Sequence, residues 1–179
     1  AFSINRGNMN EQLTLKPLEK KIISDFELSK FIVCTDAGLA SEDNRKFNDK
    51  EGRAFITTQS IKKLKAHLKK WALDTEGWKL SGSTKTYDIS KLDEMMDQAT
   101  PEEKTKIISK VFYKERWIKE NNFEQRLIVT YSIKYRDYQR NIRNAQIERA
   151  QPGFRVTGSA GRKNTAFPVF FLSLPSLIH

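Results

Sequence analysis

Hydrophobic positions in the first part of the chain alternate between helical spacing and short apolar runs typical of strands. Residues 1–4 look like the end of a strand that a turn-forming segment brings to a stop. Leucine and isoleucine recur at helical spacing between 11 and 26, with Pro17 in the first turn, where proline is tolerated. Two apolar runs, residues 30–36 and 53–58, predict strands. The first has the composition of a strand buried on both faces, as in a sheet covered by helices.

Beyond these strands, the chain is first rich in lysine and then rich in glycine, serine and threonine. We expect one lysine-rich helix over residues 61–73, followed by a loop or short strands over the Gly-, Ser- and Thr-rich residues 77–87. Thr100, Pro101 and Glu103 have the signature of a helix start. Thr100 is the predicted N-cap, proline occupies the first helical position, and Glu103 completes a capping box.

The second half of the chain is predicted to combine strands with a basic helix and an atypical end. Residues 110–114 and 125–132 have strand composition, and residues 133–150 form a strongly basic helical pattern. Residues 151–179 contain no Asp or Glu and three of the five prolines, without a helical or alternating period. We expect these residues to form a covering strand, a poorly ordered tail or sequence foreign to the parent protein, and the composition favours the last two.

In the first half of the chain, Ser41 lies between the two predicted strands and is a predicted helix N-cap.

Charge narrows the possible partners. The 179 residues carry 32 Lys and Arg against 22 Asp and Glu, a formal net charge of +10. Such a chain is attracted to polyanions, to nucleic acid first and to anionic membrane surfaces second, although basicity without a binding role remains an alternative. No apolar run approaches the ~20 residues of a membrane helix. A lone cysteine, Cys34, excludes an internal disulfide and a cysteine-cluster zinc site, and we expect it to be buried in its strand.

Asp36 is the strongest candidate for a catalytic or metal-binding residue. It comes directly after the apolar run, before Gly38, and open α/β sheets place ligand groups at the carboxyl ends of their strands. A carboxylate there is a hard oxygen ligand that suits Mg²⁺ or Mn²⁺. The competing interpretation is that Asp36 only hydrogen-bonds its own backbone in an Asx turn, a common use of aspartate in turns.

Several sequence blocks, taken in order, resemble the DDE transposases of bacterial insertion sequences. The blocks are residues 4–11 (INRGNMNE), 15–18 (LKPL), 31–41 (FIVCTDAGLAS) with Asn44, and 52–56 (GRAFI). The resemblance covers residues 1 to about 75 and continues more loosely through 125–132 and the arginine-rich helix. Because the blocks occur in the same order as in the family, together they are more specific than any one alone.

The resemblance implies an RNase H-like core, a mixed five-stranded sheet with helices on both faces, in which Asp36 is the second acid of the Asp-Asp-Glu triad. It also implies two Mg²⁺ or Mn²⁺ ions that support the cleavage and joining of DNA. The family's first aspartate lies upstream of residues 1–4. Its third acid lies in a Tyr-x2-Arg-x3-Glu-x6-Lys pattern that Tyr131, Tyr135 and Tyr138 do not match. We therefore expect a fragment from the middle of a transposase that holds one of three catalytic acids and is inactive alone.

Basic residues on two predicted helices are the candidate DNA contacts. They are Lys62, Lys63, Lys65, Lys69, Lys70, Arg136, Arg140 and Arg143. Trp71, Trp78 and Trp117 lie among the basic segments, so the hypothesis combines phosphate contact with stacking on bases. For any one cluster, a solvated face that keeps the protein soluble is the competing interpretation. The expected partners are transposon ends and target DNA. A second copy of the chain, bound as a dimer, is a further candidate partner, and we expect no binding to a membrane.

The expected fold class is α/β, with a partial RNase H-like mixed sheet, flanking helices, a β-rich inserted region and basic helices. Residues 1–75 would belong to the catalytic core, 76–150 to an inserted subdomain and 151–179 to the atypical tail. We expect a bacterial cytoplasmic protein that associates with the nucleoid when bound to DNA. A noncatalytic DNA-binding module, an RNase H-like nuclease remnant and a purely structural basic domain are the alternatives.

Overall fold

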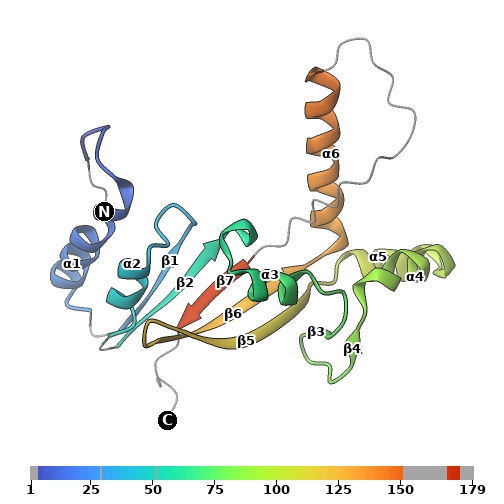
Figure 1. The fold of residues 1–179 in the computed structure, drawn as a ribbon, viewed down its shortest axis with the longest axis horizontal. Coiled ribbons are helices and arrows are strands. Elements are labelled where there is room, and N and C mark those ends of the chain that lie inside the picture. The colour runs from blue at the N-terminus through green and yellow to red at the C-terminus, as the bar shows by residue number, and fades with distance from the viewer. Residues whose placement is uncertain (1–3, 29, 51, 151–168, 174–179) are drawn as a thin grey trace. The chain divides into compact units, whose positions relative to one another are not determined.

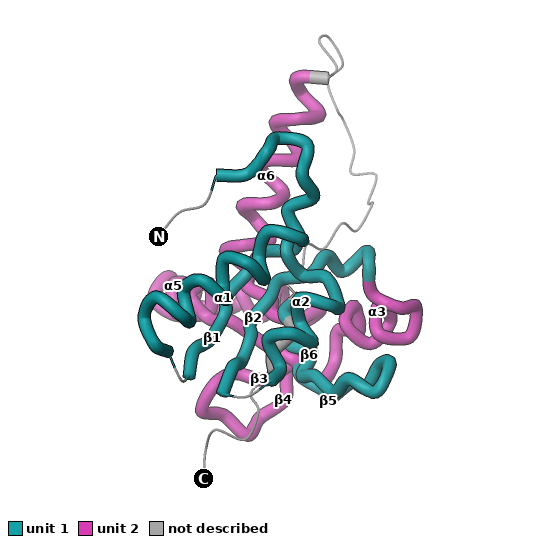
Figure 2. The backbone as a smooth tube through the Cα atoms, turned by 90° about the vertical axis from the view of Figure 1, so that its left-hand side faces the viewer, with its two compact units in different colours: residues 1–63, 115–128, 168–179 teal, residues 64–114, 129–167 magenta. Residues whose placement is uncertain are grey.

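The chain forms two compact units in a computed structural model that describes residues 4–28, 30–50, 52–150 and 169–173 (Figure 1). Unit 1 comprises residues 1–63, 115–128 and 168–179, and unit 2 comprises residues 64–114 and 129–167 (Figure 2). Each unit combines segments that are far apart in the sequence, which the composition along the chain does not reveal.

Unit 1 contains the β/α part of the chain. Its elements are η1 (Glu11–Leu13), α1 (Leu15–Phe26), β1 (Phe31–Thr35), α2 (Glu42–Phe47), β2 (Arg53–Gln59), η2 (Ile61–Lys63) and β7 (Val169–Ser173). It also holds residues 115–128 of β5 (Phe112–Glu120) and β6 (Phe123–Tyr131). The helix and the two strands predicted within residues 11–58 are confirmed. Residues 1–3 of the predicted first strand lie outside the described residues, and Ile4 is not in a strand.

Strand β1 pairs in parallel with β2, with Val33 opposite Phe55 and Thr35 opposite Thr57. On the other side of β2, β7 pairs with it in antiparallel fashion. Over the described residues, the hydrogen-bonded strand order is β1-β2-β7-β6-β5-β3-β4. The chain therefore has a mixed α/β fold, as the sequence predicts.

Strand β1 is covered on one face only. Val33 is buried, whereas Ile32 on the opposite face is 54% exposed and Cys34 is also exposed. The prediction that the strand is buried on both faces, with Cys34 in the core, is therefore wrong. Side chains alternate across a strand, so cover on the Val33 side leaves Ile32 and Cys34 accessible.

The covered face of this sheet packs against α1 and α2. Leu15 of α1 and Asn44 of α2 lie with Val33 and Phe55 around a cavity of only about 10 Å³. Such a volume has room for about one water molecule, so the layers are closely packed. Phe55 also contacts Phe123 of β6, with ring centroids 6.0 Å apart.

A buried polar pair joins α1 to the end of α2. The Asn48 side-chain amide donates a 2.9 Å hydrogen bond to Oε1 of Glu19, and both residues are almost fully buried. Oε2 of Glu19 and Oδ1 of Asn48 have no hydrogen-bond partner. Burial raises the pKa of the Glu19 carboxyl, and its hydrogen bond to Asn48 offsets this only in part. The ionised carboxylate is therefore disfavoured in the folded state.

We expect Glu19→Gln to raise the free energy of unfolding at pH 7 by about 1 kcal/mol, because the new amide can donate to Oδ1 of Asn48. A carboxyl with a raised pKa stabilises the fold fully only below its unfolded value, and this stability is lost as the pH rises through the folded value. Above the ordinary pKa of a glutamate, about 4.3, the free energy of unfolding of the variant in urea should therefore change less with pH than that of the unmodified chain. The exposed control Glu27→Gln removes the same charge, and an equal gain there would contradict the prediction.

The described residues of unit 2 form mostly helices, together with two short strands and the ends of β5 and β6. Its elements are α3 (Ala66–Leu73), β3 (Trp78–Leu80), β4 (Thr86–Tyr87), η3 (Ile89–Lys91), α4 (Leu92–Gln98), α5 (Pro101–Ile108) and α6 (Ile133–Ala150). Strand β3 pairs in antiparallel fashion with β4 and with the first residues of β5. The short strands within residues 77–87 and the helix over 133–150 are confirmed. In the part of the chain that is described, no helix is both long and apolar enough to cross a membrane.

Local sequence signals determine where several elements start and stop. The Ser41 hydroxyl accepts a hydrogen bond from the backbone N–H of Asn44, as predicted for an N-cap. Thr100 and Glu103 form the predicted capping box, with Pro101 at the first helical position. Between β5 and β6, Asn121 and Asn122 both have positive φ, the conformation that tight hairpin turns need and that asparagine tolerates. Strand β5 continues up to this turn and therefore ends at Glu120, well beyond the predicted residues 110–114.

Five residues of the atypical C-terminal segment are described. Residues 169–173 form β7, which pairs with β2 from Gln59 back to Phe55. For these residues the structure favours a strand, the alternative that composition ranked below a disordered or foreign tail. Residues 151–168 and 174–179 lie outside the described part of the chain.

Candidate functional site

Asp36 follows the last residue of β1, at the carboxyl end of the parallel β1–β2 pair. Its side chain is exposed, and Oδ1 accepts a 2.9 Å hydrogen bond from the backbone N–H of Gly38. The Thr57 hydroxyl donates to the backbone carbonyl of Asp36 at 3.3 Å, which ties this loop to β2. The carboxylate therefore orders its own loop in an Asx turn while it stays accessible to solvent.

A second carboxylate, from Glu11 of η1, lies beside that of Asp36. A Cβ atom added at Gly38 would lie 3.2 Å from Oδ1 of Asp36 and 3.4 Å from Oε2 of Glu11. Both carboxylates thus converge on one backbone position, where a side chain would crowd them. Glu11 was not predicted as a site residue, because no spacing rule links it to a residue so much later in the chain.

Asn44 holds the segments that carry these two carboxylates. Its buried side-chain amide donates to the carbonyl oxygen of Gln12 at 3.0 Å and to that of Leu39 at 3.1 Å. Gln12 is adjacent to Glu11 in η1, and Leu39 lies in the loop after Asp36. One side chain from α2 therefore fixes both acidic segments at their backbones.

The donor set is small for a metal centre. Carboxylate oxygens are suitable ligands for Mg²⁺ or Mn²⁺, and Asp36 and Glu11 supply two such groups. Within the described residues, no group of three or more His, Cys, Asp or Glu side chains could hold a metal ion. These carboxylates fit a partial ligand set, whereas a clamp for two ions draws on several carboxylates.

The predicted lysine helix is not continuous. Lys62 and Lys63 belong to η2 in unit 1, whereas Lys65, Lys69 and Lys70 belong to unit 2. The chain leaves the helical conformation at Lys65, which has φ −57° and ψ 151° and precedes the first residue of α3. All five lysines are exposed except Lys69, which is half-buried.

The arginines of α6 differ in their surroundings. The Arg136 guanidinium is largely buried and donates to Asp93 at 2.7 Å, to Asp137 at 2.9 Å and to the Tyr131 hydroxyl at 3.2 Å. Burial alone would lower its pKa, but the hydrogen bonds to the two aspartates outweigh burial and raise it. Arg136 therefore acts within unit 2, which argues against a DNA contact. Arg140 is exposed and Arg143 half-buried, so both remain candidates.

The three tryptophans are also not equivalent. Trp78 is fully buried, donates from Nε1 to the Asp74 carbonyl and packs edge-on against Tyr131. The ring of Trp71 lies 6.0 Å from Nζ of Lys114. Trp117 of β5 is 60% exposed and is the only one of the three with a largely open ring. Trp78 therefore belongs to the core of unit 2 and is not available for stacking on bases.

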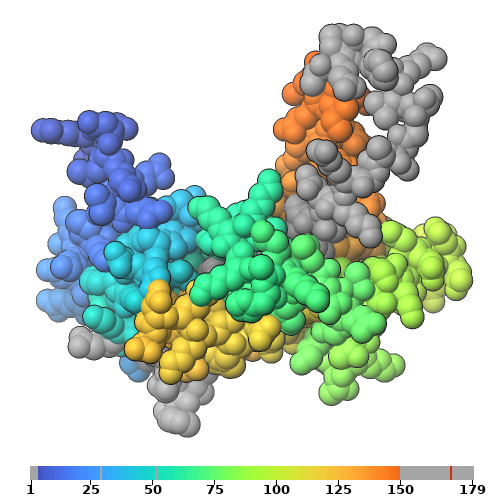
Figure 3. Space-filling model, in the orientation of Figure 1, coloured from blue at the N-terminus to red at the C-terminus, as the bar shows by residue number. Residues whose placement is uncertain are grey.

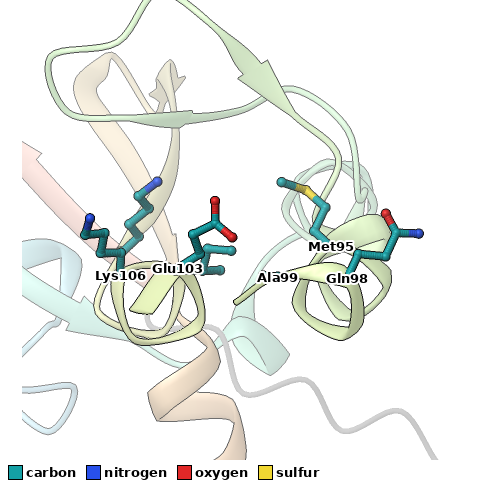
Figure 4. A pocket seen from close by; sticks show the side chains of 7 residues that line it. Met95, Gln98, Ala99, Glu103 and Lys106 are labelled. Carbon is teal, nitrogen blue, oxygen red and sulfur yellow. The ribbon is translucent and has the colours of Figure 1, made fainter. Parts of the chain in front are cut away.

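A cleft of about 420 Å³ lies between α4 and α5 in unit 2 and was not predicted from the sequence. Its lining residues are Met95, Gln98, Ala99, Glu103, Lys106, Ile107 and Lys110, five of which are labelled in Figure 4. Hydrogen bonds from the backbone and side chain of Thr100 lower the pKa of the Glu103 carboxyl, so this acid already serves the capping box. The two lysines give the cleft a basic rim.

We compared the chain with models of protein families, with curated proteins and with solved structures, and none of them matches.

Proposed function

We propose that this chain is a DNA-binding middle portion of a DDE transposase of a bacterial insertion sequence, with part of an RNase H-like core in unit 1. The observation that carries the proposal is Asp36, which follows β1 in a parallel β1–α2–β2 segment and lies beside a second carboxylate. Open α/β sheets bind ligands at this end of their strands. In the sequence resemblance, Asp36 would be the second acid of the triad.

The acidic residues would act through a divalent ion in the complete enzyme. Mg²⁺ or Mn²⁺ supplies activation of the nucleophile and stabilisation of the leaving oxygen in phosphoryl transfers of this class. In our proposal Asp36 and Glu11 provide carboxylate ligands, positioned by the backbone at Gly38 and by Asn44. Because two carboxylates are fewer than a two-ion site needs, the chain alone binds DNA without cleaving or joining it.

The basic surface supports the DNA-binding part of the proposal. The net charge is +10, and four of the five predicted lysines are exposed. Lysines that contact phosphates displace condensed counterions, so they produce an affinity that depends on salt but not on sequence. Transposon ends and target DNA are the proposed partners, and self-association as a dimer is part of the same proposal.

A salt titration of duplex binding tests this function. We expect log K for the unmodified chain to fall linearly with log salt. We expect the triple variant Lys62→Gln, Lys65→Gln, Lys69→Gln to flatten that slope by about two to three units, since each lost phosphate contact contributes about 0.9. Asp36→Asn should leave the affinity unchanged or slightly higher, because a carboxylate repels phosphate unless a metal ion intervenes.

Three other exposed lysines provide a matched control. Lys21, Lys30 and Lys50 lie away from the candidate cluster in sequence, and their change to Gln removes the same charge. An equal change of slope in the two triple variants would mean that binding follows net charge rather than the predicted cluster. No duplex binding by the unmodified chain at low salt would overturn the proposed function.

A noncatalytic DNA-binding module is the second candidate. It is favoured by the incomplete acidic set, since the described residues offer no group of three metal-ligating side chains. Both candidates bind DNA, but they differ in their use of Asp36. Binding of Mn²⁺ that is lost in Asp36→Asn supports the transposase, and equal Mn²⁺ binding by the two proteins supports the module.

A further inference from the structure

Helix α6 presents a stripe of exposed apolar and aromatic side chains. Tyr135, Tyr138 and Ile142 are 38%, 58% and 38% exposed. Their spacings of three and four residues place them on one side of the helix. Beyond Arg136, none of the described side chains of α6 is buried. The helix is drawn in orange in Figure 3, and its atoms are visible on the face of the molecule shown there. The tyrosine stripe, Tyr135–Tyr138–Ile142, is thus an accessible surface.

The two tyrosine rings form a pair. Their centroids lie 6.4 Å apart with an angle of 36° between the ring planes. A tyrosine ring offers a large flat surface with few rotatable bonds, so little conformational freedom is lost when another flat group stacks on it. Unpaired nucleobases are such groups, and stacking on aromatic side chains is how proteins hold single strands irrespective of sequence.

The charge of α6 is positive on balance. Lys134 is exposed and lies one turn before Tyr138, whereas the 52% exposed Arg140 lies two residues from Tyr138, on the other side of the helix, and pairs with Asp137 at 3.8 Å. The whole helix carries five basic residues against two acidic ones, Asp137 and Glu148. This positive charge opposes pairing with α6 of a second copy of the chain, and it favours a polyanionic ligand.

We propose that the tyrosine stripe of α6 is a stacking surface for unpaired bases of single-stranded DNA, with Lys134 as a contact to an adjacent phosphate. The proposal rests on the DNA binding proposed above and adds the kind of DNA that this helix recognises. In a duplex, the bases are already stacked inside the helix, and a protein approaching from outside meets mainly phosphates and groove edges. Exposed tyrosine rings therefore gain little from a duplex and much from an unpaired strand.

The test compares two labelled probes, a short oligothymidine and a duplex of mixed sequence, by fluorescence anisotropy at one salt concentration. We expect Tyr135→Ala with Tyr138→Ala to weaken oligothymidine binding about 10-fold or more, the effect of losing stacked bases. Duplex binding should change less than about 2-fold, because the net charge is unchanged. The control, Tyr135→Phe with Tyr138→Phe, keeps the rings and should bind both probes like the unmodified chain.

Circular dichroism of both variants establishes that α6 remains folded, so that a loss of binding can be assigned to the rings. An equal loss on both probes, no loss on either, or failure of the unmodified chain to bind oligothymidine would overturn the stacking surface. Self-association that disappears in the alanine variant would assign the stripe to a protein interface instead. Duplex binding without an effect of the tyrosines leaves the proposed function standing, whereas failure to bind either probe overturns both.

Discussion

Trp78→Ala is expected to lower the free energy of unfolding of unit 2 by about 3–5 kcal/mol, the range for removing a large aromatic side chain from a core. The indole is fully buried, packs edge-on against Tyr131 and donates from Nε1 to the Asp74 carbonyl. Its removal leaves a cavity and a carbonyl oxygen without this donor. Urea unfolding followed by circular dichroism measures the loss.

Trp117→Ala is the matched control for this effect. It removes the same side chain from a position that is 60% exposed, so we expect a change of less than about 1 kcal/mol. Trp78→Phe should recover part of the stability, because it restores most of the aromatic volume but not the N–H group. Equal losses for the two alanine variants would contradict the assignment of Trp78 to the core.

Arg45→Met is expected to lower the stability of unit 1 by about 2 kcal/mol, because it leaves a buried amide without its hydrogen-bond donor. Arg45 of α2 donates from a terminal nitrogen to Oε1 of Gln125 at 2.6 Å, and Gln125 of β6 is fully buried. Burial lowers the pKa of the Arg45 guanidinium, so the fold holds this cation at a desolvation cost.

The second substitution Gln125→Leu should restore much of what Arg45→Met removes. An apolar pair of similar volume can replace a buried polar pair at little cost, whereas removal of one partner leaves the other unsatisfied. Urea unfolding of the two single variants and the double variant gives the coupling between the residues. Additive losses in the double variant would show that the two side chains do not depend on each other.

Features encoded in neighbouring residues were predictable from the sequence. The N-caps at Ser41 and Thr100 use hydrogen bonds that reach only three residues along the chain. The position of Asp36 directly after β1 follows from the end of an apolar run, and its bond to Gly38 spans two residues. Interactions this short depend little on the rest of the fold.

The candidate site was only partly predictable, because it depends on contacts between residues that are far apart in the sequence. Glu11 and Asp36 come together because Asn44 hydrogen-bonds the backbone on both sides, a contact made only once α2 packs. The tyrosine stripe of α6 became evident as a surface only from the exposure of its rings. Neither arrangement can be predicted from the spacing of residues in the sequence.

The sequence by itself determined several elements of this protein, among them α1, β1, β2 and α6, because hydrophobic period, capping residues and turn residues act over a few neighbouring positions. It determined neither the break in the lysine helix at Lys65 nor strand β7. Tertiary structure alone decided which chemically similar residues are buried: Trp78 but not Trp117, and Arg136 but not Arg140. It also decided that Cys34 is exposed, since only one face of β1 is covered. Burial depends on partners that lie far away in the chain, and local patterns carry no information about those partners.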